Sequence, residues 1–148
     1  MSYDLKTITV LFRAKNSLET LIKQDVQSYG VNVSEFGTLE ALYHKGALTV
    51  QQIIDKVLIA NSSMTYVLDN LTKRGLITRT KDPLDKRIFK VELTPEGKAF
   101  MDQIYPQHEA NMKTVLSILS KEEQQSLQSL LKILGLSAKN FKCTKENI

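Results

Sequence analysis

The chain has 148 residues, of which 42% are hydrophobic and 24% charged, and its formal net charge is +4. These values are typical of a globular domain and exclude wholesale disorder. The single cysteine, Cys143, excludes an intramolecular disulfide framework and a cysteine-cluster metal site. No apolar run approaches the roughly 18–20 residues that cross a bilayer, and the start lacks the pattern of a secretory signal, so we expect one cytoplasmic domain.

Six stretches space their apolar residues at the period of an α-helix. In chain order they are residues 5–29, 34–43, 50–57, 61–73, 95–119 and 121–134. Ser34 is expected to cap the second helix, and Gly30, Gly75 and Gly135 to end the first, fourth and sixth. Pro106 should kink the fifth helix or mark a boundary within it.

After the fourth helix the apolar period changes from 3.6 to 2, which predicts two strands, residues 76–80 and 88–93. The segment between them, residues 81–87, is a charged turn that contains Pro and Asp. Two short helices followed by such a hairpin form a winged helix-turn-helix, whose second helix enters the major groove of DNA. We therefore expect a mainly α fold with a small β-hairpin wing, and a region binding double-stranded DNA at residues 34–94.

The positive charge is concentrated in this region. Residues 61–90 hold seven Lys or Arg and three Asp, which accounts for the whole net charge of +4. An excess confined to one stretch is typical of a surface that binds a polyanion. A solvated basic surface that binds nothing is the alternative that charge alone leaves open.

The predicted DNA contacts are polar residues that point away from the apolar stripe of the fourth helix or surround the hairpin turn. They are Asn61, Ser62, Ser63, Thr65, Tyr66, Asn70, Lys73, Lys81, Lys86 and Arg87. Arg87 suits a narrow minor groove, and Asp85 can hold its guanidinium in a fixed fork. Asp69 would repel phosphate on this face, so we expect it to pair with Lys73 one turn later; the alternative is a hydrogen bond from a cytosine amino group.

Four segments resemble the MarR family of transcriptional regulators. They are residues 62–71, residues 73–79, the wing Asp82-Pro83-Leu84-Asp85-Lys86-Arg87 and residues 91–97. The pattern D-x-R followed by L-T-x-x-G is specific at this spacing, and the resemblance covers essentially the whole chain. It implies an obligate homodimer whose terminal helices, in residues 1–30 and 95–148, interleave. It also implies binding of a near-palindromic operator, usually as a repressor released by a small aromatic ligand or an oxidant.

The apolar residues of the terminal helices also favour a homodimer. They carry more apolar surface than a winged helix of about sixty residues can cover, and burial yields roughly 25 cal/mol per Å² of apolar area. We therefore expect them to pack on a second subunit, with packing on their own subunit as the alternative.

The sequence indicates a DNA-binding surface more clearly than it indicates a sensing mechanism. Some relatives carry a peroxide-reactive cysteine near the start of the first helix; this chain has none there, and Cys143 is expected to be a bystander. A noncovalent ligand of phenolic, quinone-like or carboxylate chemistry is the remaining expectation. Candidates for lining its site are Phe12, Arg13, Tyr43, His44, Phe100, Ile104 and His108, and the alternative for each is that it is simply a core or surface residue. The central segment also resembles relatives that respond to quinones and hydroquinones.

Metal binding and catalysis have little support. The two histidines, His44 and His108, lack the spacing of metal ligands, and there is no phosphate-binding loop or nucleophile elbow. We expect neither an enzyme nor a bound cofactor. A winged helix that contacts other proteins without binding DNA is the alternative function.

Overall fold

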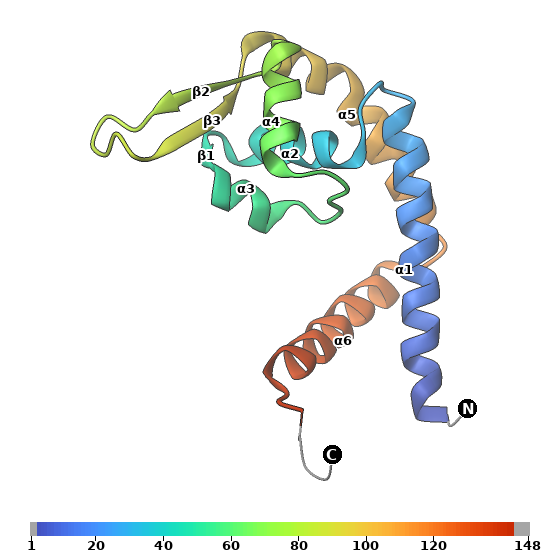
Figure 1. Ribbon diagram of the computed structural model, residues 1–148. Coiled ribbons are helices and arrows are strands. Elements are labelled where there is room, and N and C mark those ends of the chain that lie inside the picture. Colours follow the sequence, from blue (N-terminus) through green and yellow to red (C-terminus); the bar gives the residue numbers. More distant parts are fainter. Residues whose placement is uncertain (1–2, 144–148) are drawn as a thin grey trace. The chain divides into compact units, whose positions relative to one another are not determined.

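The computed structural model describes residues 3–143, and within them the expected mainly α fold with a β-hairpin wing is confirmed (Figure 1). The elements, in chain order, are α1 (Tyr3–Gln27), α2 (Val33–Lys45), β1 (Leu48–Thr49), α3 (Val50–Lys56), α4 (Met64–Lys73), β2 (Ile77–Lys81), β3 (Phe89–Leu93), α5 (Pro95–Leu116) and α6 (Lys121–Asn140). None of the helices in this part of the chain is long and apolar enough to span a membrane.

The starts of α2 and α4 differ from the sequence prediction. Asn32, not Ser34, caps α2, because its side chain accepts a hydrogen bond from the backbone N–H of Glu35 while Glu35 bonds back to the N–H of Asn32. Ser34 instead lies fully buried in the first turn. The fourth helix begins at Met64 with Ser63 as its cap, three residues later than expected.

The prediction that Gly135 ends the last helix is also wrong. Helix α6 continues to Asn140, because a glycine ends a helix only where the backbone turns left-handed, and Gly135 has no such positive φ. Gly30 and Gly75 do adopt positive φ, 82° and 74°, just after α1 and α4. Helix α5 runs through Pro106 and ends at Leu116.

The sheet has the strand order β1-β3-β2, and both pairings are antiparallel. Strands β2 and β3 form the predicted hairpin, which projects from the helices in Figure 1. Strand β1 was not predicted from the sequence, because two residues are too few to show a period of two. Leu48 pairs with Val91, and Thr49 then caps α3 in the capping box with Gln52.

The buried core joins α2, α3 and α4 to the sheet and to the first turns of α5. Its largest fully buried apolar side chains are Leu39, Ile53, Leu68, Leu71, Ile77, Met101, Val26, Val67 and Val91. This core belongs to a compact unit that extends to His108, and a second unit, from Glu109 onward, holds the end of α5 and α6. Within the second unit no side chain of α6 is buried.

The L-T-x-x-G pattern has a steric cause. Thr94 donates its hydroxyl hydrogen bond to the Gly75 carbonyl at 2.6 Å and accepts one from the N–H of Gly97 at 3.0 Å. This arrangement places α5 directly on the backbone of Leu76. A Cβ atom on Gly97 would lie 2.0 Å from the Leu76 carbonyl oxygen, so only glycine fits there.

Replacing Gly97 with alanine is therefore expected to lower the free energy of unfolding by about 1–3 kcal/mol, the usual range for overpacking. Urea denaturation followed by circular dichroism measures the change. Gly135→Ala is the matched control, because nothing lies within 4 Å of the Cβ built there. That variant should be neutral or more stable by roughly 0.5–1 kcal/mol, the gain of alanine over glycine in a helix. An equal loss in both variants would contradict the steric argument.

Candidate nucleic-acid interface

Helix α4 presents one apolar and one polar face. Val67, Leu68 and Leu71 are buried, and α4 packs with them against α2 and β2. Thr65, Tyr66 and Lys73, all predicted DNA contacts, are exposed, and Asn70 is half-buried. The cap at Ser63, whose hydroxyl accepts from the N–H of Tyr66 at 3.4 Å, fixes where this face begins. The exposed side chains are short donors and acceptors, one aromatic ring and one cation, which can approach base edges and phosphates.

The segment before α4 is held by α2. The Ser34 hydroxyl donates to Asn61 Oδ1 at 2.7 Å and accepts from the Asn61 backbone N–H at 2.8 Å. Asn61 and Ser62 were expected in the first turn of the helix; they lie in the turn that precedes it instead. Asn61 thus anchors this turn, and its contact with DNA stays a prediction, as it does for Ser62 and Ser63.

Local hydrogen bonds close the wing turn. Asp82 Oδ1 accepts from the backbone N–H groups of Leu84, at 2.8 Å, and Asp85, at 3.3 Å. Backbone bonds from Asp82 N–H to the Ile88 carbonyl and from Ile88 N–H to the Asp85 carbonyl complete it. A turn closed by its own aspartates holds the side chains around it without help from the core.

The cations of the wing are exposed. Lys81 places its ammonium 5.8 Å from the centre of the Phe89 ring, and Lys86 and Arg87 stand out from the turn. These three side chains, all predicted DNA contacts, therefore offer positive charge at the tip and along the edge of the hairpin.

Asp85 forms the expected fork with Arg87. Arg87 Nε donates to Oδ1 at 3.1 Å and Nη2 to Oδ2 at 3.3 Å, while the guanidinium itself stays largely exposed. The side-chain and backbone hydrogen bonds from Arg87 hold the pKa of Asp85 below its usual value, against a smaller opposing effect of desolvation. Two bonds to one planar group leave Arg87 pre-oriented for an anion.

The expected pairing of Asp69 with Lys73 is wrong. Asp69 Oδ1 accepts from Arg79 Nη2 at 3.1 Å instead. Strand β2 packs against α4, which brings the guanidinium of Arg79 to this carboxylate. Arg79 was not among the predicted site residues, because helical spacing relates only residues of one helix.

Several of the candidate ligand-binding residues gather in a group of aromatic rings. Centroid distances of 4.5–5.8 Å join Phe36, Tyr43, His44, Tyr105 and His108. Tyr43 donates to Asp102 at 2.5 Å, which raises the pKa of the tyrosine. Tyr105 was not among the predicted residues, although its spacing of three from His108 puts both on one side of α5.

His108 is part of a buried polar cluster. Its Nδ1 lies 2.6 Å from Asp25 Oδ2, and the Tyr29 hydroxyl donates to Asp25 Oδ1 at 2.7 Å. Its Nε2 lies 3.9 Å from Glu40 Oε2. These contacts join α1 and α2 to α5, so His108 has a structural role, and its binding of a ligand stays a prediction.

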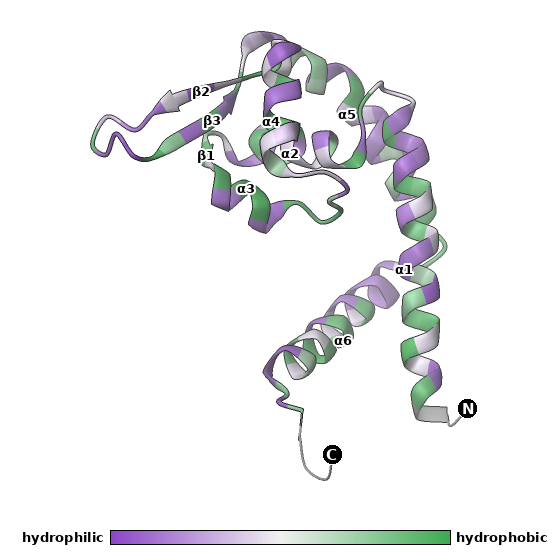
Figure 2. Cartoon of the chain, in the orientation of Figure 1, coloured by the Kyte–Doolittle hydropathy of each residue, from purple (hydrophilic) through white to green (hydrophobic). Residues whose placement is uncertain are grey.

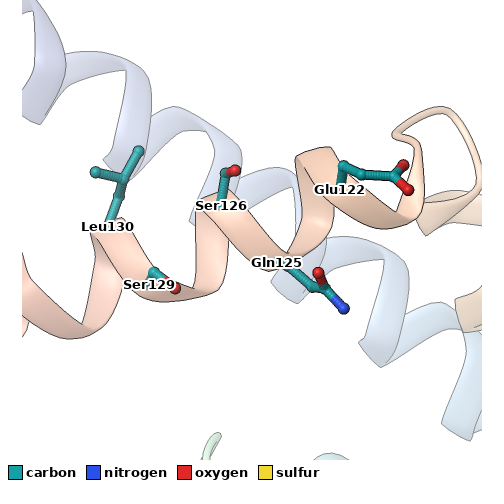
Figure 3. A pocket seen from close by; sticks show the side chains of 5 residues that line it. All are labelled: Glu122, Gln125, Ser126, Ser129 and Leu130. Carbon is teal, nitrogen blue, oxygen red and sulfur yellow. The ribbon is translucent and has the colours of Figure 1, made fainter.

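The other candidate ligand-binding residues are not part of this group of rings. Ile104 is buried and Phe100 half-buried against the core, whereas Phe12 and Arg13 are exposed on α1. A hollow of about 480 Å³ lies along α6 and includes none of the candidates (Figure 3). Its lining comes from Glu122, Gln125, Ser126, Ser129 and Leu130, all on one helix. Among the side chains that the structure describes, residues 5–143, no three His, Cys, Asp or Glu gather into a metal site.

Comparison with known proteins places this geometry among transcriptional regulators. The model of the MarR family matches residues 31–89, from before α2 to the start of β3. The HTH-type transcriptional regulator MhqR of Bacillus subtilis is 39% identical over 137 residues, which are 93% of this chain and 94% of that protein.

Two solved structures share the fold. NadR in complex with 4-hydroxyphenylacetate is 25% identical, with a TM-score of 0.71 over 85% of this chain and 89% of NadR. A mutant of MarR from E. coli in complex with operator DNA is 20% identical, with a TM-score of 0.74 over 90% of this chain and 99% of MarR. At that identity the second likeness shows the fold alone.

Replacing Arg87 with alanine is expected to raise the pKa of Asp85 toward its ordinary value, because the largest cause of the lowering is the side-chain hydrogen bonding of Arg87, while the backbone N–H of residue 87 still donates in the variant. A lowered pKa means that the fork persists at neutral pH and is lost as the pH falls through that pKa. An NMR titration of the side-chain carboxyl carbon follows this directly. Lys86→Ala removes a neighbouring charge without a bond to Asp85 and should move the pKa less; equal shifts in both variants would argue against the fork.

Proposed function

The chain belongs to the MarR family of DNA-binding transcriptional regulators, and on that premise we propose that it is a homodimeric repressor, released from a near-palindromic operator by a small aromatic or quinone-like ligand. The observation that carries the proposal is that the exposed face of α4 and the cations of the wing belong to one compact unit. That unit also contains the aromatic rings proposed to sense the ligand.

DNA reading is divided between the two elements. The exposed side chains of α4, with Thr65 and Tyr66 near its start, enter the major groove. Lys73 and the cations of the wing neutralise phosphates, and Arg87 reaches the minor groove, where negative potential is strongest when the groove is narrow. The fork with Asp85 supports this role because it fixes the guanidinium before DNA arrives.

The dimer is supported by apolar side chains that the described residues leave uncovered. On α6 all side chains are at least partly exposed, and Figure 2 shows hydrophobic residues along both α1 and α6. The most exposed large apolar residues of α6 are Leu130, Ile133 and Leu136, at 64%, 66% and 59%. Exposure of so many apolar side chains to water is unfavourable for a single subunit, and packing against a second copy would bury them.

An aromatic effector is supported by the ring group on α2 and α5. Tyr43, His44 and Tyr105 offer ring faces and polar edges, the combination that phenolic and quinone-like molecules require. The structure of NadR contains 4-hydroxyphenylacetate, a phenol with a carboxylate. A ligand of this class held against α2 and α5 would act on the same unit that carries α4 and the wing.

Arg87→Ala is expected to weaken binding to a duplex selected with the wild-type protein from a randomised library. The loss should be about 1–3 kcal/mol, and the dependence of log K on log salt should become shallower by about 0.9 for each phosphate that the variant no longer neutralises. Fluorescence anisotropy at several salt concentrations measures both quantities.

Lys121→Ala is the control for that measurement, because it removes one exposed cation at the start of α6, outside the predicted interface. It should leave affinity and salt slope unchanged. An Arg87→Ala variant that binds like the wild type would refute the assignment of the wing, and failure of the wild type to select any duplex would refute DNA binding. Repeating the titration with 4-hydroxyphenylacetate tests release by a phenolic acid.

The double variant Leu130→Glu, Leu134→Glu is expected to convert a dimer into monomers, because it places charge among the exposed apolar residues of α6. Sedimentation velocity should give the wild type twice the 16.8 kDa mass of one chain and the variant that mass once. Lys132→Glu alters charge on the same helix without touching the apolar residues and should remain dimeric. A monomeric wild type at micromolar concentration would disprove the proposed assembly.

A further inference from the structure

The ion pair between Asp69 and Arg79 joins the two elements that the protein uses on DNA. Asp69 lies on α4 and is largely exposed, and Arg79 lies on β2 at the base of the wing. Arg79 Nη2 donates to Asp69 Oδ1 at 3.1 Å. This is the bond that the Arg79 side chain makes within the described part of the chain.

The register of the hairpin explains why Arg79 reaches α4. Arg79 pairs directly with Val91, and residues opposite one another in an antiparallel ladder point to the same face of the sheet. Val91 is fully buried, so this face is the one that packs on the core. The stem of Arg79 therefore starts on the core face, and its guanidinium emerges beside α4.

Electrostatic attraction to DNA does not explain why position 69 carries a carboxylate. Asp69 puts a negative charge on the face that approaches phosphates, which opposes binding. An ion pair as exposed as this one also contributes little to folding stability. If Asp69 acts by orienting Arg79, both its position on this face and its small contribution to stability are accounted for.

We propose that Asp69 is a positioning residue for DNA binding, which holds the Arg79 guanidinium between α4 and β2 as a ligand for one DNA phosphate. A guanidinium has five N–H donors in a rigid plane, and Asp69 uses one of its nitrogen atoms. The remaining N–H donors lie in the plane that the carboxylate orients. Donors held in a fixed plane suit a phosphate oxygen better than those of a freely rotating side chain do. Arg79 thereby acts in the same way as Arg87, whose guanidinium Asp85 orients on the wing.

The decisive variant is Asp69→Asn, because charge and positioning predict opposite signs. Loss of a negative charge alone would strengthen binding to a duplex selected with the wild type, whereas loss of positioning should weaken it by about fivefold or more. Asp55→Asn is the matched control: Asp55 is an exposed carboxylate on α3 that accepts from Gln51 and orients no arginine. The control should bind as tightly as the wild type, or more tightly.

A double-mutant cycle separates this role from a direct contact between Asp69 and a base. Arg79→Ala should weaken binding and make the salt slope shallower by about 0.9, the value for one phosphate. Adding Asp69→Asn to Arg79→Ala should then change the affinity little, because the two side chains act as one unit. A further loss of the same size as in the single variant would assign Asp69 to a base and overturn the proposal, as would tighter or unchanged binding by Asp69→Asn alone.

Two further variants guard against a simple folding defect. Asp69→Glu keeps the carboxylate and should retain most of the affinity, while Arg79→Lys keeps the charge but loses the planar fork and should bind more weakly than the wild type. Thermal unfolding of each variant, measured in parallel, should match the wild type. If Arg87→Ala weakens binding and Arg79→Ala does not, the wing assignment stands and the proposal for Arg79 and Asp69 fails.

Discussion

The burial of one face of α4 is the constraint on which the rest of the structure depends. Val67, Leu68 and Leu71 are in the core, so the helix can present only its opposite face to a partner. Thr65, Tyr66 and Lys73 lie on that exposed face, and it is these side chains that the proposed function brings to DNA. The same core contains Ile77 and Val91, and it thereby fixes the strands from which the wing extends.

Two kinds of polar contact then refine this arrangement. The wing turn is held by bonds between residues only a few positions apart, such as Asp82 with Leu84 and Asp85 with Arg87. Helix α4 and the turn before it make bonds to distant elements, from Ser34 to Asn61 and from Asp69 to Arg79. Local bonds give the wing turn its shape, whereas the long-range bonds form where core packing has already brought α2, α4 and β2 together.

This division explains what the sequence could predict. Apolar periods identified the helices and the hairpin, and the fork of Arg87 followed from a spacing of two residues. The partner of Asp69 could not be predicted, because ten residues and a turn separate it from Arg79 and only the packing of β2 on α4 brings them together. Asp25 and His108, 83 residues apart, illustrate the same limit for the buried cluster. Ser34 was mistaken for a cap because Asn32 and Ser34 both suit that position, and the side chain of Glu35 decides between them.

The close approach of Gly97 to Leu76 also determines how motion passes through the molecule. No side chain separates the first turn of α5 from the backbone where α4 ends and β2 begins, and the Thr94 backbone N–H bonds to the Leu76 carbonyl at 3.1 Å. Close-packed protein interiors have low compressibility and transmit strain, and here two backbones touch with no side chain between them to change rotamer. We therefore expect a shift imposed on the start of α5 to reach the joint between α4 and β2 with little loss.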